Sequence, residues 1–412
     1  MSAFGEAGRL ACDLAALAAP HGRALAAAEA KLARLLRHAG TAVPWYRRLF
    51  AEAGLDPRRA DRAALARLPV TRKAHWRDRL GADFHAEGVD LSRCRWLRSS
   101  GTTGPAAAIP ILARDRLIRR VGTQRAFRAA GLGLRDRYAW VRAAHGALVA
   151  PPVHERAGFL RTRYVDLLEP PDQWWPGLVA LAPRGLLGFP LETEAVARRV
   201  AQGRLPPLPH PVVCGLYGEH IDAEARGAIE TALGPVREMY GSAEAGTIAW
   251  SCGRGPAWHV NADFVIVEFL EDGVPVPPGA RGEVVVTNLH SWAMPVIRYG
   301  QGDIGWEEPG PCPCGRPGPL MRIVPGFRQG PFRLPSGRRV AARFFVQAMP
   351  SLDWVLDWEV EQPEPDRLAM TLTTSRPVPR SETDALASAI AAACWEPVRV
   401  EVNARVLTAE AT

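Results

Sequence analysis

The sequence predicts an α/β protein in which a large layered domain precedes a small α+β domain. Short apolar runs alternate with helical segments between residues 137 and 234, as buried parallel strands and their covering helices do. Two long β-type runs joined by a Gly/Pro-rich turn follow at 259–289 and indicate a mainly antiparallel, β-rich subdomain. A dense Pro/Gly stretch at 307–331 marks a domain boundary.

Apolar periodicity and glycine or proline stops predict the elements before this boundary. The expected helical segments are 8–50 with a stop at Gly40, 45–54, a helix after Pro69, 114–132, 192–203 and 222–234. The expected strands are 107–112, 137–143, 184–190 and 210–219.

Residues 1–326 are expected to form the large domain and residues 327–412 the small one. The small domain is predicted to contain a helix at 338–352, a hairpin at 353–375, a helix at 381–395 and a strand at 398–407. This α-β-β-α-β order favours a ferredoxin-like arrangement. Ser381, with Asp384 three residues later, is expected to cap the second of these helices.

The positive charge of the chain comes almost entirely from arginine. The net charge is +8 and the pI about 9.4, yet Lys31 and Lys73 are the only lysines. The arginines form no basic run and no aromatic–basic pattern, which argues against a nucleic-acid partner. No apolar run approaches 18 residues, so no membrane partner is expected. Seven unevenly placed cysteines do not resemble a disulfide framework, which predicts a cytoplasmic protein.

The run RSSGTTG at 98–104 predicts an anion-binding loop. Glycines let the chain curl so that backbone N–H groups and hydroxyls converge on a phosphate. The run fits neither a Walker A loop nor a dinucleotide fingerprint, and composition alone leaves a flexible surface turn as an equal alternative. The residues concerned are Ser99, Ser100, Gly101, Thr102, Thr103 and Gly104.

Three further stretches, together with this loop, resemble the motifs of the adenylate-forming (ANL) superfamily in the same chain order. VCGLYGEHI at 213–221 resembles its G-E segment, MYGSAEAG at 239–246 its Y-G-x-T-E motif, and VIRYGQGDIG at 296–305 its R-Y-x-T-G-D motif. The stretch VPWYRRLFAEAGLDP, followed by LARLPVTRKAHWRDR, resembles the opening of phenylacetate–CoA ligases. The resemblance covers nearly the whole chain and is weakest after about residue 326.

This resemblance implies that ATP and a carboxylic acid react to give acyl-AMP, and that CoA, a carrier thiol or an amine then accepts the acyl group. It implies that Ser99–Gly104 hold the β- and γ-phosphates and that Glu244 ligates Mg²⁺. Asp303 would take both ribose hydroxyls. Tyr240–Gly241 and the Gly218–Glu219 segment would border the adenine and the acyl group. Relatives of this kind are often homodimers.

The acyl pocket is expected to draw on the strand and loop YAWVRAAHGAL, with Trp140, His145 and Tyr217 as candidates. An aromatic slot suits a flat aryl acid. His145 is equally compatible with a satisfied core histidine.

Cys252, His259, Cys312 and Cys314 form a C-x6-H…C-x-C pattern that predicts a metal centre. Zinc favours four thiolate or imidazole ligands in a tetrahedron, and closed sites of this kind are structural. Three free cysteines and an ordinary histidine are the alternative. The same pattern binds zinc in many phenylacetate–CoA-ligase-like proteins, so the resemblance implies a structural zinc that clips the β-rich region to the segment before the hinge.

The chain departs from the family pattern where the family has lysine and hinge residues. Pro105 directly follows the glycine loop, GFRQG at 326–330 replaces G-R-x-D-D, and no lysine follows Lys73. Arg328 is the candidate to serve in their place. One hypothesis is an ATP-dependent ligase of aryl or similar acids, of the kind used in secondary metabolism, with altered activity. The other is a remodelled homologue that binds nucleotide or acyl-adenylate as an accessory or acyl-transfer protein.

Overall fold

The computed structural model describes residues 21–78, 82–98, 108–143, 153–156, 158–325, 331–349 and 354–407. These residues group into two compact units, and neither unit is one continuous stretch of chain. The first unit contains the described parts of 1–99, 107–129 and 239–324, and the second those of 130–238 and 325–412. The division expected at residues 326 and 327 stays a prediction.

The first unit is built on antiparallel strands in the order β11-β10-β12-β13-β14-β9-β8-β7, with β1 and β2 as a separate pair. β10 and β12 are the two long runs predicted at 259–289, and they pair directly. The bounds are β1 Arg95–Arg98, β2 Ala108–Ile111, β7 Val236–Ser242 (in this unit from Met239), β8 Gly246–Ser251, β9 Trp258–Val260, β10 Val265–Glu271, β11 Val274–Pro275, β12 Gly282–Asn288, β13 Val296–Glu308 and β14 Leu320–Ile323.

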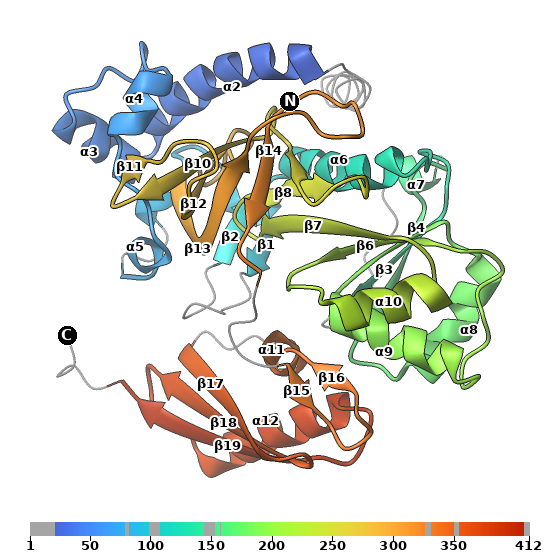
Figure 1. Cartoon of the computed structure of the whole chain (residues 1–412). Helices are drawn as coiled ribbons and strands as arrows, with labels where there is room; N and C mark the ends of the chain where they lie inside the picture. Colours follow the sequence, from blue (N-terminus) through green and yellow to red (C-terminus); the bar gives the residue numbers. More distant parts are fainter. Residues whose placement is uncertain are drawn as a thin grey trace. The chain divides into compact units, whose positions relative to one another are not determined.

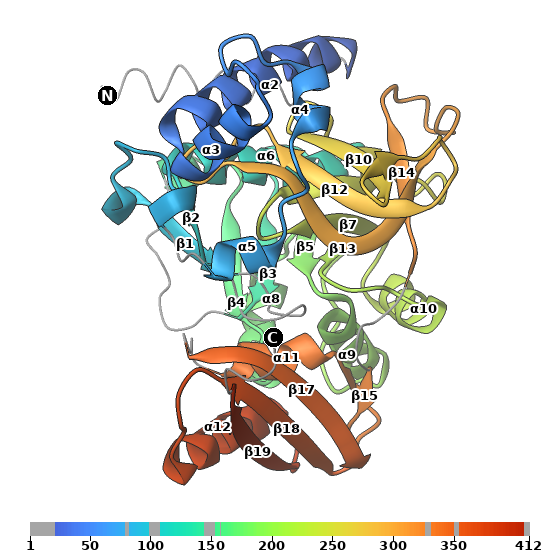
Figure 2. The same cartoon turned by 90° about the vertical axis from the view of Figure 1, so that its left-hand side faces the viewer.

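Helices cover these strands because their apolar faces share cores with them. The helices are α2 His21–Ala42, α3 Pro44–Glu52, α4 Arg62–Arg67, α5 Lys73–Asp78 and α6 Ala113–Ala129, with 3-10 turns η1 Ala82–Phe84 and η2 Leu91–Arg93. Leu35 and Phe50 belong to one hydrophobic cluster with Ile266 and Ile297, and α2 to α4 lie beside β10 and β12 in both views (Figures 1 and 2). Among the described helices of either unit, none has the length and apolar character that a membrane crossing requires.

A buried polar network ties α2 and α6 to the segment before β10. The Arg125 guanidinium pairs with both oxygens of Asp263, at 2.6 and 2.7 Å, and lies 4.4 Å from the centroid of Phe264. Lys31 donates to the Asp263 carbonyl at 2.8 Å and lies 3.2 Å from His290 Nε2. Burial, and next Lys31, lower the pKa of His290 to about 3, so the imidazole stays neutral beside the ammonium group.

The second unit contains the predicted parallel strands, in the order β6-β5-β3-β4. Their bounds are β3 Tyr138–Arg142, β4 Thr162–Asp166, β5 Gly185–Gly188 and β6 Val213–Tyr217. The helices between and after them are α7 Val153–Arg156, α8 Pro171–Leu181, α9 Pro190–Ala201 and α10 Ala223–Ala232. Figure 1 shows α8, α9 and α10 beside these strands. The strands predicted at 137–143, 184–190 and 210–219 and both predicted helices are therefore confirmed.

The C-terminal residues of this unit form β15 Phe332–Arg333, β16 Arg339–Val340, α11 Ala342–Ala348, β17 Val355–Glu364, β18 Arg367–Thr374, α12 Arg380–Ala393 and β19 Arg399–Val406. From α11 onward they have the predicted α-β-β-α-β order, but two short strands that were not predicted, β15 and β16, precede it, and β16 occupies the start of the helix predicted at 338–352. β18 pairs antiparallel with β17 and parallel with β19 (Figure 2). Phe344 and Leu372 share a hydrophobic cluster with Trp175 and Leu216, so these elements are part of the unit's core.

The predicted cap of α12 is wrong. The N-cap residue is Pro379, and no side chain caps the helix. A proline there fixes φ near the value that the first turn needs, so the helix begins one residue before Ser381.

Candidate functional site

The turn between β7 and β8 carries Glu244 and is built by two glycines. A Cβ at Gly241 would lie 2.2 Å from the Gly246 carbonyl oxygen, so no side chain fits there. Gly246 has φ +75°, which favours glycine. The two glycines therefore let β7 and β8 approach closely enough to form a tight turn, with Glu244 between them.

Polar contacts hold Glu244 on both its backbone and its side chain. Arg119 of α6 donates to the carbonyls of Ala243 and Glu244, at 2.7 and 2.8 Å. Asn288 donates to the Glu244 carbonyl at 3.2 Å, and the Tyr299 hydroxyl donates to the carboxylate at 3.3 Å. Glu244 is only 5% exposed. The carboxylate is thus fixed in one place, as a metal ligand or an orienting group must be.

Tyr240 lies against Asp303 and within the electrostatic influence of Glu244. Its hydroxyl donates to Asp303 Oδ2 at 2.8 Å. Burial raises the pKa of Tyr240 well above its usual value, and the negative charges of Asp303 and Glu244 add to this effect. Asp303 itself is an exposed residue. Three residues predicted from two motifs therefore lie in the first unit, and two of them, Tyr240 and Asp303, are in direct contact.

Arg119 is a site residue that the sequence did not identify. Burial lowers the pKa of its guanidinium to about 10, and the charges of Asp115 and Glu244 oppose that shift. Arg119 therefore stays charged at neutral pH and brings a cation to the Glu244 turn. Its position as the seventh residue of α6 is the only sequence signal, and α6 has several arginines.

The second unit brings Trp140 and Tyr217 together, as the pocket prediction requires. Trp140 Nε1 donates to the Tyr217 hydroxyl at 2.8 Å. The Phe189 ring lies 4.6 Å from that of Tyr217, and the Tyr164 ring 5.7 Å from that of Trp140. Burial raises the pKa of Tyr217 to about 12, so its hydroxyl stays protonated. The result is a cluster of aromatic rings, with the Arg142 guanidinium 5.0 Å from the centroid of the Tyr164 ring.

Glu219 follows this cluster in the chain and is buried in an ion pair. Arg343 of α11 donates to Glu219 Oε1 at 2.8 Å and to Glu192 Oε2 at 2.5 Å. The side chains of all three residues are at most 6% exposed. Burial raises the pKa of Glu219, Arg343 opposes the shift, and the neighbouring Glu192 charge adds to it. Sequence reasoning missed both Arg343 and Glu192.

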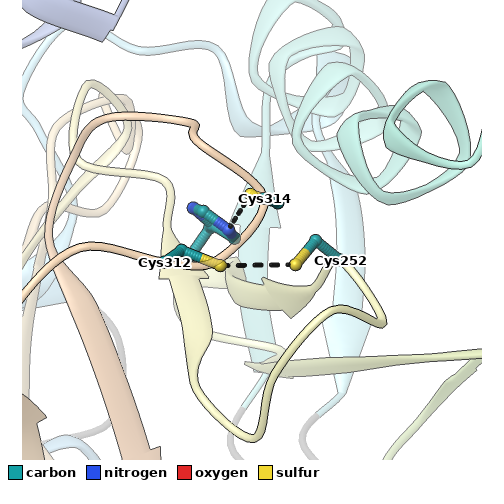
Figure 3. A group of neighbouring side chains, drawn as sticks. Cys252, Cys312 and Cys314 are labelled. Carbon is teal, nitrogen blue, oxygen red and sulfur yellow. Dashed lines mark hydrogen bonds between the residues drawn. The ribbon is translucent and has the colours of Figure 1, made fainter.

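The four predicted metal ligands of the first unit meet in space. Cys252 follows β8, His259 lies on β9, and Cys312 and Cys314 lie between β13 and β14. Their ligand atoms all lie within 4.8 Å of one another. Cys252 Sγ is 3.5 Å from Cys312 Sγ, and Cys314 Sγ is 3.3 Å from His259 Nε2 (Figure 3).

The chemistry of this donor set fits zinc. A zinc ion about 2.3 Å from each sulfur would hold two thiolates about 3.8 Å apart, close to the observed spacing. Gly315 has φ +73°, and its N–H donates to the Cys312 carbonyl at 3.0 Å, which makes the turn that aims both thiolates inward. The Trp250 ring stacks on His259 at 4.8 Å and restrains the imidazole.

The remaining predicted site residues lie outside the described part of the chain. They are Ser99, Ser100, Gly101, Thr102, Thr103, Gly104, His145 and Arg328.

Comparison of the sequence with known proteins finds two curated ligases. A phenylacetate–coenzyme A ligase of Thermus thermophilus is 26% identical over 317 residues, which are 72% of this chain and 68% of that ligase. A phenylacetate–coenzyme A ligase of Escherichia coli is 27% identical over 298 residues, 67% of this chain and 65% of that ligase. The aligned segments thus span about two thirds of each relative. No family model matches the chain.

Comparison of the structure finds the same fold in a 2-hydroxyisobutyryl-CoA ligase. Its complex with an acyl-AMP and CoA in the thioesterification state covers 95% of this chain and 89% of its own, with a TM-score of 0.66 and 20% identity. The same ligase in a postadenylation state gives a TM-score of 0.61 at 18% identity, and it covers 95% of this chain and 88% of its own. These neighbours have the α/β fold predicted from the sequence.

Proposed function

Because the chain belongs to the adenylate-forming superfamily, in its phenylacetate–CoA ligase-like branch, we propose that it activates a carboxylic acid and passes the acyl group to CoA. A carboxylate oxygen attacks the α-phosphorus of ATP, and pyrophosphate leaves. The CoA sulfur, after losing its proton, then attacks the acyl carbon, and AMP leaves. The acid is an aryl or similar small acid, since the candidate pocket residues Trp140 and Tyr217 form an aromatic cluster.

The observation that carries this proposal is the joint position of Tyr240, Glu244 and Asp303 in the first unit. Asp303 is exposed and suits a pair of ribose hydroxyls, because a carboxylate accepts two hydrogen bonds at once. Glu244, fixed by Arg119 and Tyr299, suits the Mg²⁺ that accompanies ATP. When bound, Mg²⁺ neutralises phosphate charge.

A hydroxamate assay tests this function directly. Incubation with ATP, Mg²⁺, hydroxylamine and a panel of acids that includes phenylacetate and 2-hydroxyisobutyrate is expected to release pyrophosphate and form a hydroxamate. Aryl acids are expected to react faster than small aliphatic acids. Omitting either ATP or the acid is the control. No hydroxamate from any acid of a broad panel, with zinc-replete protein, would contradict the proposal.

The remodelled, non-ligating homologue is not favoured, because the relatives and the structural neighbours named above are CoA ligases. No lysine follows Lys73, however, so lysine side chains from that part of the chain cannot neutralise phosphate or carboxylate charge. Arginine must supply the protein's cations near the reacting groups. Arginine stays charged but has a planar fork in place of a compact ammonium group.

Arg119→Met is expected to lower the rate of acyl-AMP formation roughly 10- to 100-fold, since two charge-assisted hydrogen bonds to the Glu244 turn are lost. Arg119→Lys is expected to recover part of the rate, because an ammonium group can hold one carbonyl. ATP–pyrophosphate exchange measures both variants. Arg116→Met changes an exposed arginine of the same helix and should match the parent. Equal rates for Arg119→Met and Arg116→Met would rule out this role.

We also propose that Cys252, His259, Cys312 and Cys314 hold a structural zinc ion, supported by the spacing of their ligand atoms. The ion would join the segment after β8 to the segment between β13 and β14. It would therefore support β13, the strand that carries Asp303.

A further inference from the structure

Two buried arginines fix the segment that begins at β15 to the parallel-strand part of the second unit. Arg339 on β16 pairs with Glu194 at 2.7 Å and with Asp222 at 2.6 Å. Arg343 on α11 pairs with Glu192 at 2.5 Å and with Glu219 at 2.8 Å. Both arginine side chains are 5% exposed. Each pair joins residues more than 100 positions apart in the chain.

These two arginines differ in what they hold. Glu194 lies inside α9 and Asp222 caps α10 by accepting from the Ala225 N–H, so Arg339 contacts only the scaffold. Arg343 instead holds Glu219, which follows Gly218 in the segment that the resemblance to adenylate-forming enzymes assigns to the adenine and the acyl group. The Arg343 guanidinium also lies 3.6 Å from the centroid of Phe189, the ring that contacts Tyr217.

Gly218, the residue before Glu219, has no room for a side chain. Gly218 has φ +92°, and a Cβ on it would lie 2.9 Å from the Phe189 ring and 3.9 Å from Arg343 Nε. Any side chain there would displace Phe189 and strain the backbone. Phe189 on one side and Arg343 on the other therefore set the direction in which the Glu219 side chain projects from the backbone.

The charge balance makes Glu219 depend on Arg343. Two carboxylates share one guanidinium, and Glu219 Oε2, Glu192 Oε1 and Arg343 Nε have no hydrogen-bond partner among the described residues. Without the guanidinium, two negative charges would remain buried side by side. The free-energy cost of burying both carboxylates would then exceed the cost of burying either one alone. One carboxylate must then take up a proton or move toward water.

We propose that Arg343 is a positioning residue that couples docking of the segment 332–348 to the placement of Glu219. The inference rests on the proposed function, because Glu219 matters only if the Gly218–Glu219 segment borders a nucleotide or its acyl group. On this basis Arg343 on α11 holds the Gly218–Glu219 segment in the position that the ligand requires.

Calorimetric titration with AMP, in parent and variant proteins, tests the coupling. Arg343→Met is expected to weaken AMP binding about tenfold or more, because a charge-assisted contact to Glu219 is lost. Arg343→Lys is expected to recover part of that affinity, since an ammonium group reaches one carboxylate. Arg339→Met is the matched control: it removes the other buried arginine of the same segment and should leave AMP affinity within about twofold.

Amide hydrogen exchange of α11 reports docking separately from ligand affinity. In both methionine variants the amides of α11 are expected to exchange faster than in the parent, since each variant loses a buried ion pair. Equal AMP affinities in Arg343→Met and the parent would overturn the positioning role, as would an equal loss in Arg339→Met. If Arg343→Met does not fold, unchanged AMP affinity in Arg343→Lys overturns the role in the same way. A parent protein that binds neither AMP nor ATP would instead contradict the proposed function.

Discussion

Replacing Cys252 with serine is expected to remove the proposed zinc ion and to destabilise the first unit. Zinc that binds only the folded protein stabilises it by about 4 kcal/mol when free zinc is 1,000-fold above its dissociation constant. The serine variant loses that contribution, because a hydroxyl does not replace a thiolate as a zinc ligand. β9, which carries His259, and β14, which pairs with it, are the strands most affected.

Elemental analysis and thermal unfolding check this prediction. The parent is expected to contain one zinc per chain and to melt at a lower temperature after treatment with a strong chelator. Cys252→Ser is expected to contain none and to show no further change with the chelator. Cys94→Ser is the matched control, since Cys94 lies outside the cluster in the same unit. The assignment would be contradicted if the parent contained no metal and its melting temperature did not change when zinc was added.

Glu244→Gln is expected to lower the rate of acyl-AMP formation by about 10²- to 10³-fold, the usual cost of removing one preorganised electrostatic contact from an active site. The amide keeps the shape of the side chain but removes the charge that suits Mg²⁺. The loss is expected in kcat and kcat/KM together, because the charge acts where phosphate charge develops. ATP–pyrophosphate exchange with varied Mg²⁺ measures it.

Two further variants make that result specific. Tyr299→Phe removes only the hydroxyl that donates to Glu244, so its rate should fall by about tenfold or less. Glu271→Gln changes a carboxylate at the exposed end of β10 and should have no effect. Exchange activity in Glu244→Gln within twofold of the parent would show that this carboxylate does not serve the reaction.

Sequence patterns predicted many of the elements, though not β4, α8, β15 or β16, and the residues whose type is rare in the chain. Alternating runs predicted β3, β5 and β6, since parallel strands are buried on both faces and leave an apolar signature. Four cysteine and histidine positions predicted the metal cluster, because few of these residues exist and their spacing is distinctive. Motif order likewise predicted Tyr240, Glu244 and Asp303 as neighbours.

Arg119 and Arg343 could not be predicted as site residues from the sequence, for a physical reason. Arginine supplies nearly all the positive charge of this chain, so residue type alone does not separate a buried arginine from one in water. What distinguishes them is tertiary: the carbonyls of Ala243 and Glu244 for the first, and the carboxylates of Glu192 and Glu219 for the second. The pattern at Ser381 failed because a neighbouring proline set the helix start.

The discontinuous chain path of the first unit has a consequence for its synthesis. Leu32 and Leu36 of α2 share a core with Leu289 and Ile297, and Lys31 bonds to a carbonyl 232 residues later. A ribosome that adds 5–20 residues per second needs roughly 10 to 50 seconds to make the intervening chain. During that time the apolar face of α2 lacks the partners that cover it in the folded protein. Nascent chains halted before β10 are therefore expected to need chaperones to avoid aggregation.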